Sequence, residues 1–336
     1  MFLTGSSRRV RLALVRAVVF TGAGANEIVS FEERADPSPT GGELLVQVRY
    51  AALNGADLAQ RAGRYPAPAG SPQDIPGIEV AGVVIARGET ARGFEIGDRV
   101  FGIVGGGGLA DRVVVHERHV VAVPAALEDA GAAAVPEVFI TAHDAIASLA
   151  GLRPGELLVV TGANGGVGTA AIQIGVVSGA RVLATVRSVD VRRDVAALGA
   201  EVIGQSDLVE RAQQLGGADV VIELVGAPNL ESDFGALATK GRIVIVGTGA
   251  GVDAEISLRT LMGKRARMIG TGLRHRPLEE KALAVQLFGR EVVPHLATRR
   301  IVPLVDRVFP AEEAHAAFDR MEGPGKLGKV LLDFGE

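Results

Sequence analysis

The stretch Leu157–Ile174, LLVVTGANGGVGTAAIQI, decides the fold. An apolar run ends at Thr161, glycines follow at Gly162, Gly165 and Gly168, and an apolar helical pattern comes next. The first glycine permits a sharp turn, the middle ones let the backbone approach a diphosphate, and the last allows close helix–strand packing. Backbone N–H groups and the positive end of the helix dipole then face the phosphates. The alternative is a glycine-rich turn that binds nothing, but the order strand, loop, helix favours a dinucleotide site. The loop residues expected to hold the dinucleotide are Gly162, Asn164, Gly165, Gly166, Val167 and Gly168.

The surrounding segment, residues 139–277, alternates strand and helix patterns. Its strand-like runs are LLVVT, RVLATV, DVVIELV and RIVIVG, and its helix-like runs are VGTAAIQIGVVSG, DVRRDVAALGA and FGALATK. Such alternation predicts βαβ units and a parallel sheet. We therefore predict an α/β protein with a doubly wound nucleotide-binding domain at 139–277.

The flanking segments have a different character. Residues 15–138 consist of short β-rich runs between turn signals, which predict a compact antiparallel, barrel-like domain. Residues 278–336 hold two helical stretches and two strand-like runs, and we expect them to return to that domain. Residues 1–14 are predicted to be a disordered extension, because Arg8, Arg9 and Arg11 interrupt any signal-peptide core.

Composition excludes several classes of function. The chain carries 35 basic and 39 acidic side chains without a basic patch, so we expect no nucleic-acid partner. It has no run of about twenty apolar residues, so we expect no membrane span. It has no cysteine, which rules out disulfides, thiolate catalysis and Cys-ligated zinc. A chain without disulfides fits a reducing compartment, and we expect a cytoplasmic protein.

The second strand of the βαβ pattern indicates which dinucleotide is bound. An NAD site places Asp or Glu at the end of this strand, where it holds the ribose 2′-hydroxyl. Here the strand RVLATV is followed by Arg187 and Ser188, and Arg192 comes soon after. Arginine and serine suit a 2′-phosphate, so we predict NADPH. Asp190 is the competing observation, and we interpret it as a first-turn helix acid beneath a Ser188 cap.

Nearly the whole chain from Val15 onward resembles the zinc-independent quinone oxidoreductases of the medium-chain dehydrogenase/reductase type, the group that includes zeta-crystallin. The matching stretches are AALNGADLAQRAGRYP, IPGIEVAGVV, GDRVFGIVGGGGLADRVVV, VPEVFITAHDAI, TGANGGVGTAAIQI and KLGKVLL, in family order. The resemblance implies a GroES-like catalytic domain beside a Rossmann domain. In zinc-dependent relatives a cysteine ligand stands where this chain has Asn54, so we expect no metal.

The resemblance also implies roles for single residues. Asn54 and Tyr65 match residues that lie beside the nicotinamide, although Tyr65 would otherwise be an ordinary turn aromatic. Asp57 is expected to be structural, bonding a neighbouring loop. Further cofactor contacts are expected from Thr141, at the domain junction, and from Val225, Gly226, Gly247, Thr248, Leu273 and Lys329. Many relatives stack a tyrosine or histidine on adenine near the place where this chain has Gln205.

The expected reaction is hydride transfer from NADPH to a quinone or a similar electron-poor carbonyl acceptor, with Tyr65 and the Asn54 amide donating hydrogen bonds to the developing negative charge. The alternatives are an NADPH-dependent enoyl- or acryloyl-type reductase and a nucleotide-binding protein without turnover. We expect a homodimer in which the apolar strand RMIGTGL, residues 267–273, pairs across a two-fold axis. His116 and His119 are expected to be isolated, on opposite faces of one strand.

Overall fold

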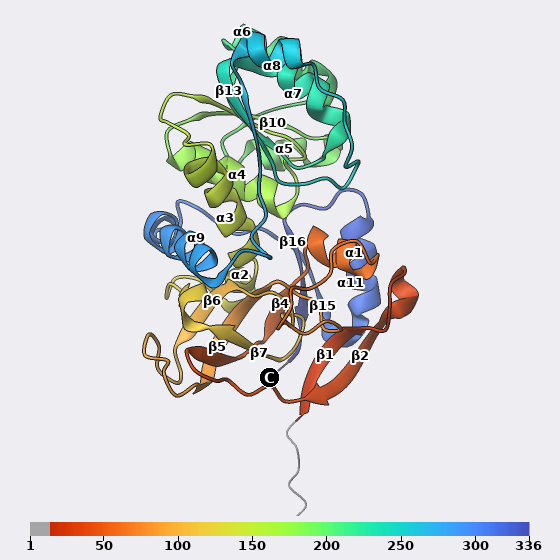
Figure 1. Ribbon diagram of the computed structural model, residues 1–336, viewed down its shortest axis with the longest axis vertical. Coiled ribbons are helices and arrows are strands. Elements are labelled where there is room, and N and C mark those ends of the chain that lie inside the picture. The colour runs from red at the N-terminus through yellow and green to blue at the C-terminus, as the bar shows by residue number, and fades with distance from the viewer. Residues whose placement is uncertain (1–13, 336) are drawn as a thin grey trace, which may run out of the picture.

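A computed structural model describes residues 14–335, so the predicted disordered extension lies outside the described residues apart from Leu14. Figure 1 shows two bodies: a sheet covered by helices in the upper half, and a β-rich body in the lower half. Helix α3 (Pro136–His143) lies between them. The predicted fold class is confirmed, because a Rossmann-type parallel sheet accompanies a GroES-like β-rich body.

The upper sheet has six parallel strands in the order β11-β10-β9-β12-β13-β14. The strands are β9 (Leu157–Val160), β10 (Arg181–Thr185), β11 (Glu201–Ile203), β12 (Ala218–Glu223), β13 (Leu237–Ile245) and β14 (Arg267–Gly270). The helices of this body are α4 (Gly166–Val177), α5 (Arg192–Ala196), α6 (Leu208–Gln214), α7 (Leu230–Ala236) and α8 (Leu258–Lys264). The chain winds outward from β9 in one direction and resumes at β12 in the other. The carboxyl ends of β9 and β12 therefore form the switch point at which doubly wound sheets bind ligands.

Burial explains why the strand of the glycine motif is apolar throughout. All four residues of β9, LLVV, are at most 1% exposed, as expected for a central parallel strand covered on both faces. Helix α4 lies close above it. A Cβ at Gly175 would come within 2.5 Å of Leu158 Cδ2, and one at Gly168 within 2.6 Å of Ala163 Cα. These two glycines therefore set the distance between helix and sheet.

One helical prediction in this body is wrong at its end. The run FGALATK was expected to be helical, but α7 ends at Ala236 and Leu237 begins β13. Leu237 pairs with Ala218 of β12 and is 2% exposed in the core. Burial against the neighbouring strand outweighs the local helical preference of these residues.

The lower body is built on a five-stranded antiparallel sheet in the order β7-β3-β5-β6-β8. Its strands are β3 (Glu43–Gln47), β5 (Glu79–Arg87), β6 (Arg99–Ile103), β7 (Arg112–His116) and β8 (Val120–Ala122). A hairpin of β1 (Leu14–Phe20) and β2 (Val29–Ala35) lies beside it, with helices α1 (Gly55–Arg61) and α2 (Asp129–Ala133).

The end of the chain lies in the same lower body. Strand β16 (Lys329–Asp333) pairs antiparallel with β4 (Tyr50–Ala52) and parallel with β15 (Val305–Pro310). The helices of this segment are α9 (Leu278–Glu291), α10 (Val293–Ala297) and α11 (Ala314–Glu322). The exact domain boundaries expected from the sequence, at 15–138, 139–277 and 278–336, remain predictions.

The expectation for His116 and His119 is wrong. Strand β7 ends at His116, and Glu117–His119 form a 3-10 turn in which the Arg118 N–H donates to His116 Nδ1. The turn brings the two imidazole rings to 5.5 Å, instead of placing them on opposite faces. Among residues 14–335, no group of three or more histidine, aspartate or glutamate side chains gathers to hold a metal. In the same range, no helix is both long and apolar enough to cross a membrane.

Candidate active site

The glycine loop forms an open cradle at the carboxyl end of β9. Gly162 has φ +57°, a conformation that side-chain-bearing residues rarely adopt, and it turns the chain at the strand end. Gly165 lies at the N-cap of α4, and a Cβ there would meet no atom closer than Gly162 O at 3.6 Å. A Cβ at Gly166 would instead come within 2.7 Å of Val138 Cγ1. At Gly165 a Cβ would thus meet protein only at ordinary contact distance, and this more open side of the loop suits a dinucleotide diphosphate at the helix N-terminus.

The chain near residue 328 docks on this loop from the lower body. Gly165 and Gly328 form a parallel bridge, and the Gly328 N–H donates to Asn164 O at 3.1 Å. The Asn164 side chain donates from Nδ2 to Lys326 O at 2.9 Å. Asn164 therefore holds the two bodies together, and its predicted contact with the dinucleotide stays a prediction.

The loops after β12 and β13 lie next to the glycine loop and are fixed by Glu223. This fully buried carboxylate accepts from the N–H groups of Val225 and Gly226 at 2.5 and 2.6 Å, and from Thr161 Oγ1 at 2.8 Å. Sequence reasoning missed Glu223, although a carboxylate closing the apolar run DVVIE was the available signal.

Close backbone packing explains why the next loops carry glycine. A Cβ at Gly226 would come within 2.9 Å of Thr248 Cα, and one at Gly247 within 2.3 Å of Leu224 O. Gly226 also has φ +117°. The predicted residues Val225, Gly226, Gly247 and Thr248 thus lie together at the carboxyl edge of the sheet.

The end of β10 carries the residues predicted to select the dinucleotide. Arg187 is exposed and Ser188 partly exposed, with Ser188 Oγ 3.4 Å from Asp190 Oδ2. The side chain of Arg192 is held by one long hydrogen bond, 3.4 Å from Nη2 to Val186 O, and its buried Nε has no partner. The strand therefore ends in a cationic surface that suits a phosphate. Gln205, noted near the adenine position, is engaged by Thr185 Oγ1 at 2.8 Å.

At the junction of the two bodies, Asn54 is bonded at both ends of its amide. Its Nδ2 donates to Glu79 Oε1 at 2.7 Å, and its Oδ1 accepts from Lys329 Nζ at 2.6 Å. Lys329 Nζ also donates to Glu79 Oε1 at 2.7 Å and to Leu53 O at 2.9 Å. The three protons of the ammonium are therefore used inside the protein. The predicted contacts of Asn54 and Lys329 with the dinucleotide and the substrate stay predictions, but each group already has partners.

These residues do not fit a zinc ion. The chain has no cysteine, and the Lys329 ammonium lies where it binds both Asn54 Oδ1 and Glu79 Oε1. A cation placed on these oxygens would be repelled by that charge. The Lys329 ammonium thus pairs with the carboxylate of Glu79, which is buried in the lower body.

Asp57 takes the structural role expected of it. Its two oxygens accept from the backbone N–H groups of Asn54 at 2.7 Å and Gly77 at 3.0 Å, which joins the start of α1 to the loop before β5. Burial raises the pKa of Asp57 to about 6, and the hydrogen bonds and the nearby Lys329 oppose this shift.

Tyr65 is held at the junction by an arginine that sequence reasoning missed. Arg274 Nη1 donates to Tyr65 O at 2.9 Å, its guanidinium lies 5.2 Å from the ring centroid, and the His275 ring meets the tyrosine edge-on at 5.1 Å. Burial is the main cause that raises the pKa of Tyr65, so its hydroxyl stays a proton-bearing donor at neutral pH. The neighbouring Leu273 is 5% exposed and belongs to the main core.

Thr141 is buried on α3 and donates from Oγ1 to Glu137 Oε1 at 3.1 Å. The backbone N–H of Glu137 donates to Glu79 Oε2 at 2.9 Å. Burial and the adjacent Glu79 charge raise the pKa of Glu137 to about 7, while Lys329 opposes the shift. The structure therefore adds Glu79 and Glu137 to the predicted residues Asn54, Thr141 and Lys329.

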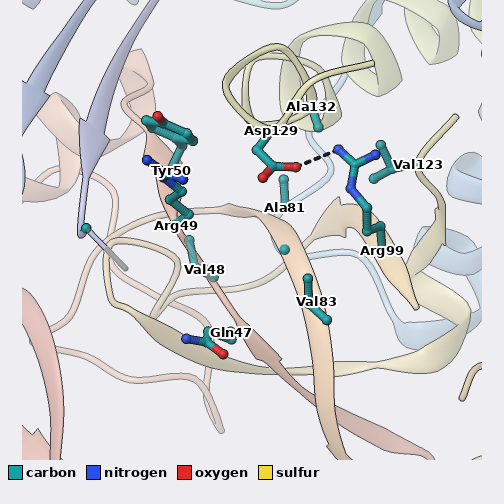
Figure 2. Close-up of a pocket in the computed structure, with 12 residues that line it drawn as sticks. Gln47, Val48, Arg49, Tyr50, Ala81, Val83, Arg99, Val123, Asp129 and Ala132 are labelled. Atoms are coloured by element: carbon teal, nitrogen blue, oxygen red, sulfur yellow. Dashed lines mark hydrogen bonds and ion pairs between the residues drawn. The ribbon is translucent and has the colours of Figure 1, made fainter. Parts of the chain in front are cut away.

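A separate hollow of about 260 Å³ lies elsewhere on the lower body (Figure 2). Ala81, Val83, Val123 and Ala132 line it, and Arg99 pairs with Asp129 at its rim at 2.5 Å. None of the predicted site residues contributes to its wall. It is therefore not the place where the predicted residues meet.

Comparisons with known proteins match both bodies of the chain to dehydrogenase families. The profile named "Zinc-binding dehydrogenase" matches residues 166–289, and "Alcohol dehydrogenase GroES-like domain" matches residues 40–125. The quinone oxidoreductase of Lama guanicoe is 31% identical over 328 residues, which covers 95% of this chain and 97% of that protein. The human quinone oxidoreductase is 29% identical, with 95% and 98% covered.

Solved structures share the whole fold. An alcohol dehydrogenase superfamily protein from Novosphingobium aromaticivorans is 31% identical with a TM-score of 0.84, covering 96% of this chain and 100% of that one. A mycobacterial protein solved with NADPH has a TM-score of 0.86 at 23% identity, with 95% and 99% covered, and this likeness concerns the fold alone.

Proposed function

The chain belongs to the medium-chain dehydrogenase/reductase family, and from that premise we propose that it is a zinc-free, NADPH-dependent reductase acting on a quinone or a similar electron-poor carbonyl acceptor. The family and its dinucleotide-binding fold make the protein an NAD(P)-dependent oxidoreductase. The choice of NADPH and of the acceptor is the proposal.

The observation that supports NADPH is the end of β10. The strand finishes at Thr185, and the exposed Arg187 follows, with Ser188 beside it and Arg192 one turn further. A guanidinium there would form charge-assisted hydrogen bonds with a 2′-phosphate, whereas a carboxylate would be needed to hold a free 2′-hydroxyl. Asp190 is exposed and lies next to Ser188, so it is the residue that an NADH-using protein would have to employ.

The acceptor class follows from what the junction offers to a developing negative charge. The bound nicotinamide supplies the hydride. Tyr65 contributes a hydroxyl that remains protonated at neutral pH, and the partners of Asn54 leave its amide less free to donate. This modest electrophilic assistance suits an acceptor that is easily reduced. The relatives named quinone oxidoreductase support the same class.

The test compares both dinucleotides over a panel of quinones, enones and acyl thioesters. Arg187→Ala should raise the KM for NADPH about 10–100-fold, because a charge-assisted hydrogen bond contributes about 1.5–3 kcal/mol, and should leave the KM for NADH almost unchanged. Arg181→Ala, at the opposite end of the same strand, is the matched control and should change neither.

Each competing function predicts a different result. Equal effects of Arg187→Ala on the two dinucleotides would remove the proposed NADPH selection. Faster turnover of enones or acyl thioesters than of quinones would indicate an alkene reductase. If none of these acceptors supports the oxidation of NADPH, only a nucleotide-binding role remains.

A further inference from the structure

Glu137 lies at the meeting point of the two bodies, in the first turn of α3. Its N–H donates to Glu79 on β5, and its side chain accepts from Thr141, the residue expected to approach the nicotinamide. The flanking residues Pro136 and Val138 are buried, but Glu137 itself remains partly exposed. A carboxyl group is thus presented from a rigid helix at the place where the predicted substrate and dinucleotide residues gather.

The two oxygens of this carboxyl differ. Oε1 accepts from Thr141 Oγ1 at 3.1 Å. Within residues 14–335, Oε2 has no hydrogen-bond partner, and it is not among the buried atoms left without one, so it reaches solvent. Thr141 therefore orients the group and leaves Oε2 available to a bound molecule.

Charged groups from several elements interact with Glu137. Glu79 of β5 and Asp57 of α1 favour its protonated form, and Lys329 of β16 favours the ionised form. Arg274, Lys281 of α9 and the Tyr65 hydroxyl also interact with it electrostatically. Burial is the main cause that raises the pKa of Glu137 to about 7, the Glu79 charge adds to the rise, and Lys329, which is paired with Glu79 at 2.7 Å, opposes it.

We propose that Glu137 is the proton donor of the reduction. Its Oε2 delivers a proton to the oxygen of the acceptor after hydride has been transferred. This inference rests on the proposed function. Hydride addition turns a neutral quinone into a hydroquinone monoanion. The O–H bond of Glu137 then breaks as a new O–H bond forms on the acceptor oxygen. The carboxylate left behind regains a proton from solvent, so one quinone, one NADPH and one proton give one hydroquinone and one NADP⁺.

The other acids of the cluster are less suited to this task. Both oxygens of Asp57 accept backbone N–H groups, and Glu79 is bound to Lys329 and Asn54. Tyr65 has a raised pKa and can donate a hydrogen bond but releases its proton poorly. Of the carboxyl groups in this cluster, Glu137 is the one that combines a solvent-facing oxygen with a titration near neutral pH.

The test uses Glu137→Gln, which keeps the shape and the Thr141 contact but carries no acidic proton. With a quinone, kcat/KM of the wild type should fall above pH about 7 as Glu137 ionises. In the variant it should be lower by about 10²–10⁴-fold and should lack that alkaline limb. A cationic hydride acceptor, which becomes neutral on reduction and needs no proton, should be reduced equally fast by both proteins. Glu137→Asp should restore part of the rate and a pH-dependent limb.

A second readout does not require turnover. In the ligand-free protein, infrared spectroscopy should show protonated-carboxyl absorption with a component that disappears near pH 7 and is missing from Glu137→Gln, while the components of Asp57 and Asp233 remain in both proteins. Thermal unfolding of the two proteins should show that both are folded. An unchanged alkaline limb in the variant, equal loss of rate with the cationic acceptor, or identical infrared titrations would overturn the inference. A wild type that reduces no quinone would instead refute the proposed function.

Discussion

At the scale of single residues, the buried carboxyl groups fall into two kinds. Glu79 and Glu223 have an ammonium or several N–H and O–H donors around them. Glu137 and Asp233 have fewer donors and retain a proton. Hydrogen bonds to a carboxylate favour its ionised form, so burial raises the pKa most where such donors are few, as at Glu137 and Asp233.

Asp233 gives a prediction at this scale. It is fully buried on α7 beside Glu223, and neither of its oxygens has a donor. Burial is the main cause that raises the pKa of Asp233 to about 9, and the Glu223 charge adds to the rise. Because the unfolded chain loses this proton near pH 4, the stability that the proton contributes is complete below pH about 4 and is lost as pH rises towards 9.

Asp233→Asn should remove this dependence, because an amide does not titrate in this pH range. The free energy of unfolding of the variant, minus that of the wild type, should grow between pH 5 and 8 by at most about 1.4 kcal/mol per unit. Urea unfolding at several pH values measures it. A difference that stays constant over this range would show that Asp233 is ionised in the folded protein.

At the scale of elements, the two ends of the glycine loop should respond differently to a single methyl group. Gly165 has φ −75°, which alanine adopts readily, and its Cβ would project into the open cradle. Gly165→Ala should therefore weaken NADPH binding at least ~10-fold, as measured by calorimetry, with a loss of stability of about 1 kcal/mol or less at the N-cap.

Gly168→Ala should act in the opposite way, because its Cβ would meet the backbone of Ala163 at 2.6 Å. We expect the free energy of unfolding to fall by about 1–3 kcal/mol through overpacking. Gly263→Ala on α8, where a Cβ meets nothing within 4 Å, is the control and should not destabilise the protein. Equal binding losses in Gly165→Ala and Gly263→Ala would place the diphosphate elsewhere.

Elements with a periodic sequence were predictable, and contacts between distant residues were not. The strand–glycine–helix pattern of residues 157–174 indicates the parallel sheet, because each feature is local. Asn54, Tyr65 and Thr141 came from family resemblance. Glu79 and Arg274 were missed because their roles depend on partners far along the chain, such as Lys329 for Glu79. The turn that joins His116 to His119 was missed because a 3-10 turn of three residues is too short to produce a periodic pattern of apolar and polar residues.

At the scale of the whole molecule, the six-stranded sheet has an edge strand, β14, that the described residues of a single chain leave unpaired on one side. Strand β14 pairs with β13 on one side, and no described strand pairs with its other side. Apolar side chains are exposed on this strand and in the segment just before it: Met268 (44%), Met262 (75%), Leu258 (65%) and Val252 (76%). An exposed edge with apolar neighbours invites pairing. We predict that two copies pair their β14 strands antiparallel about a two-fold axis.

The double substitution Met262→Glu/Met268→Glu should break this dimer, because the two-fold axis would bring the new carboxylates of both copies together in an interface that excludes water. Light scattering should give twice the 34.7 kDa chain mass for the wild type and a single chain mass for the variant. Leu283→Glu, equally surface-placed at 60% exposure on α9, is the control and should stay dimeric. Since Asn54, Glu137, Lys329 and the glycine loop all come from one chain, the monomeric variant should still bind NADPH. Loss of binding together with the dimer would mean that the second subunit completes the site.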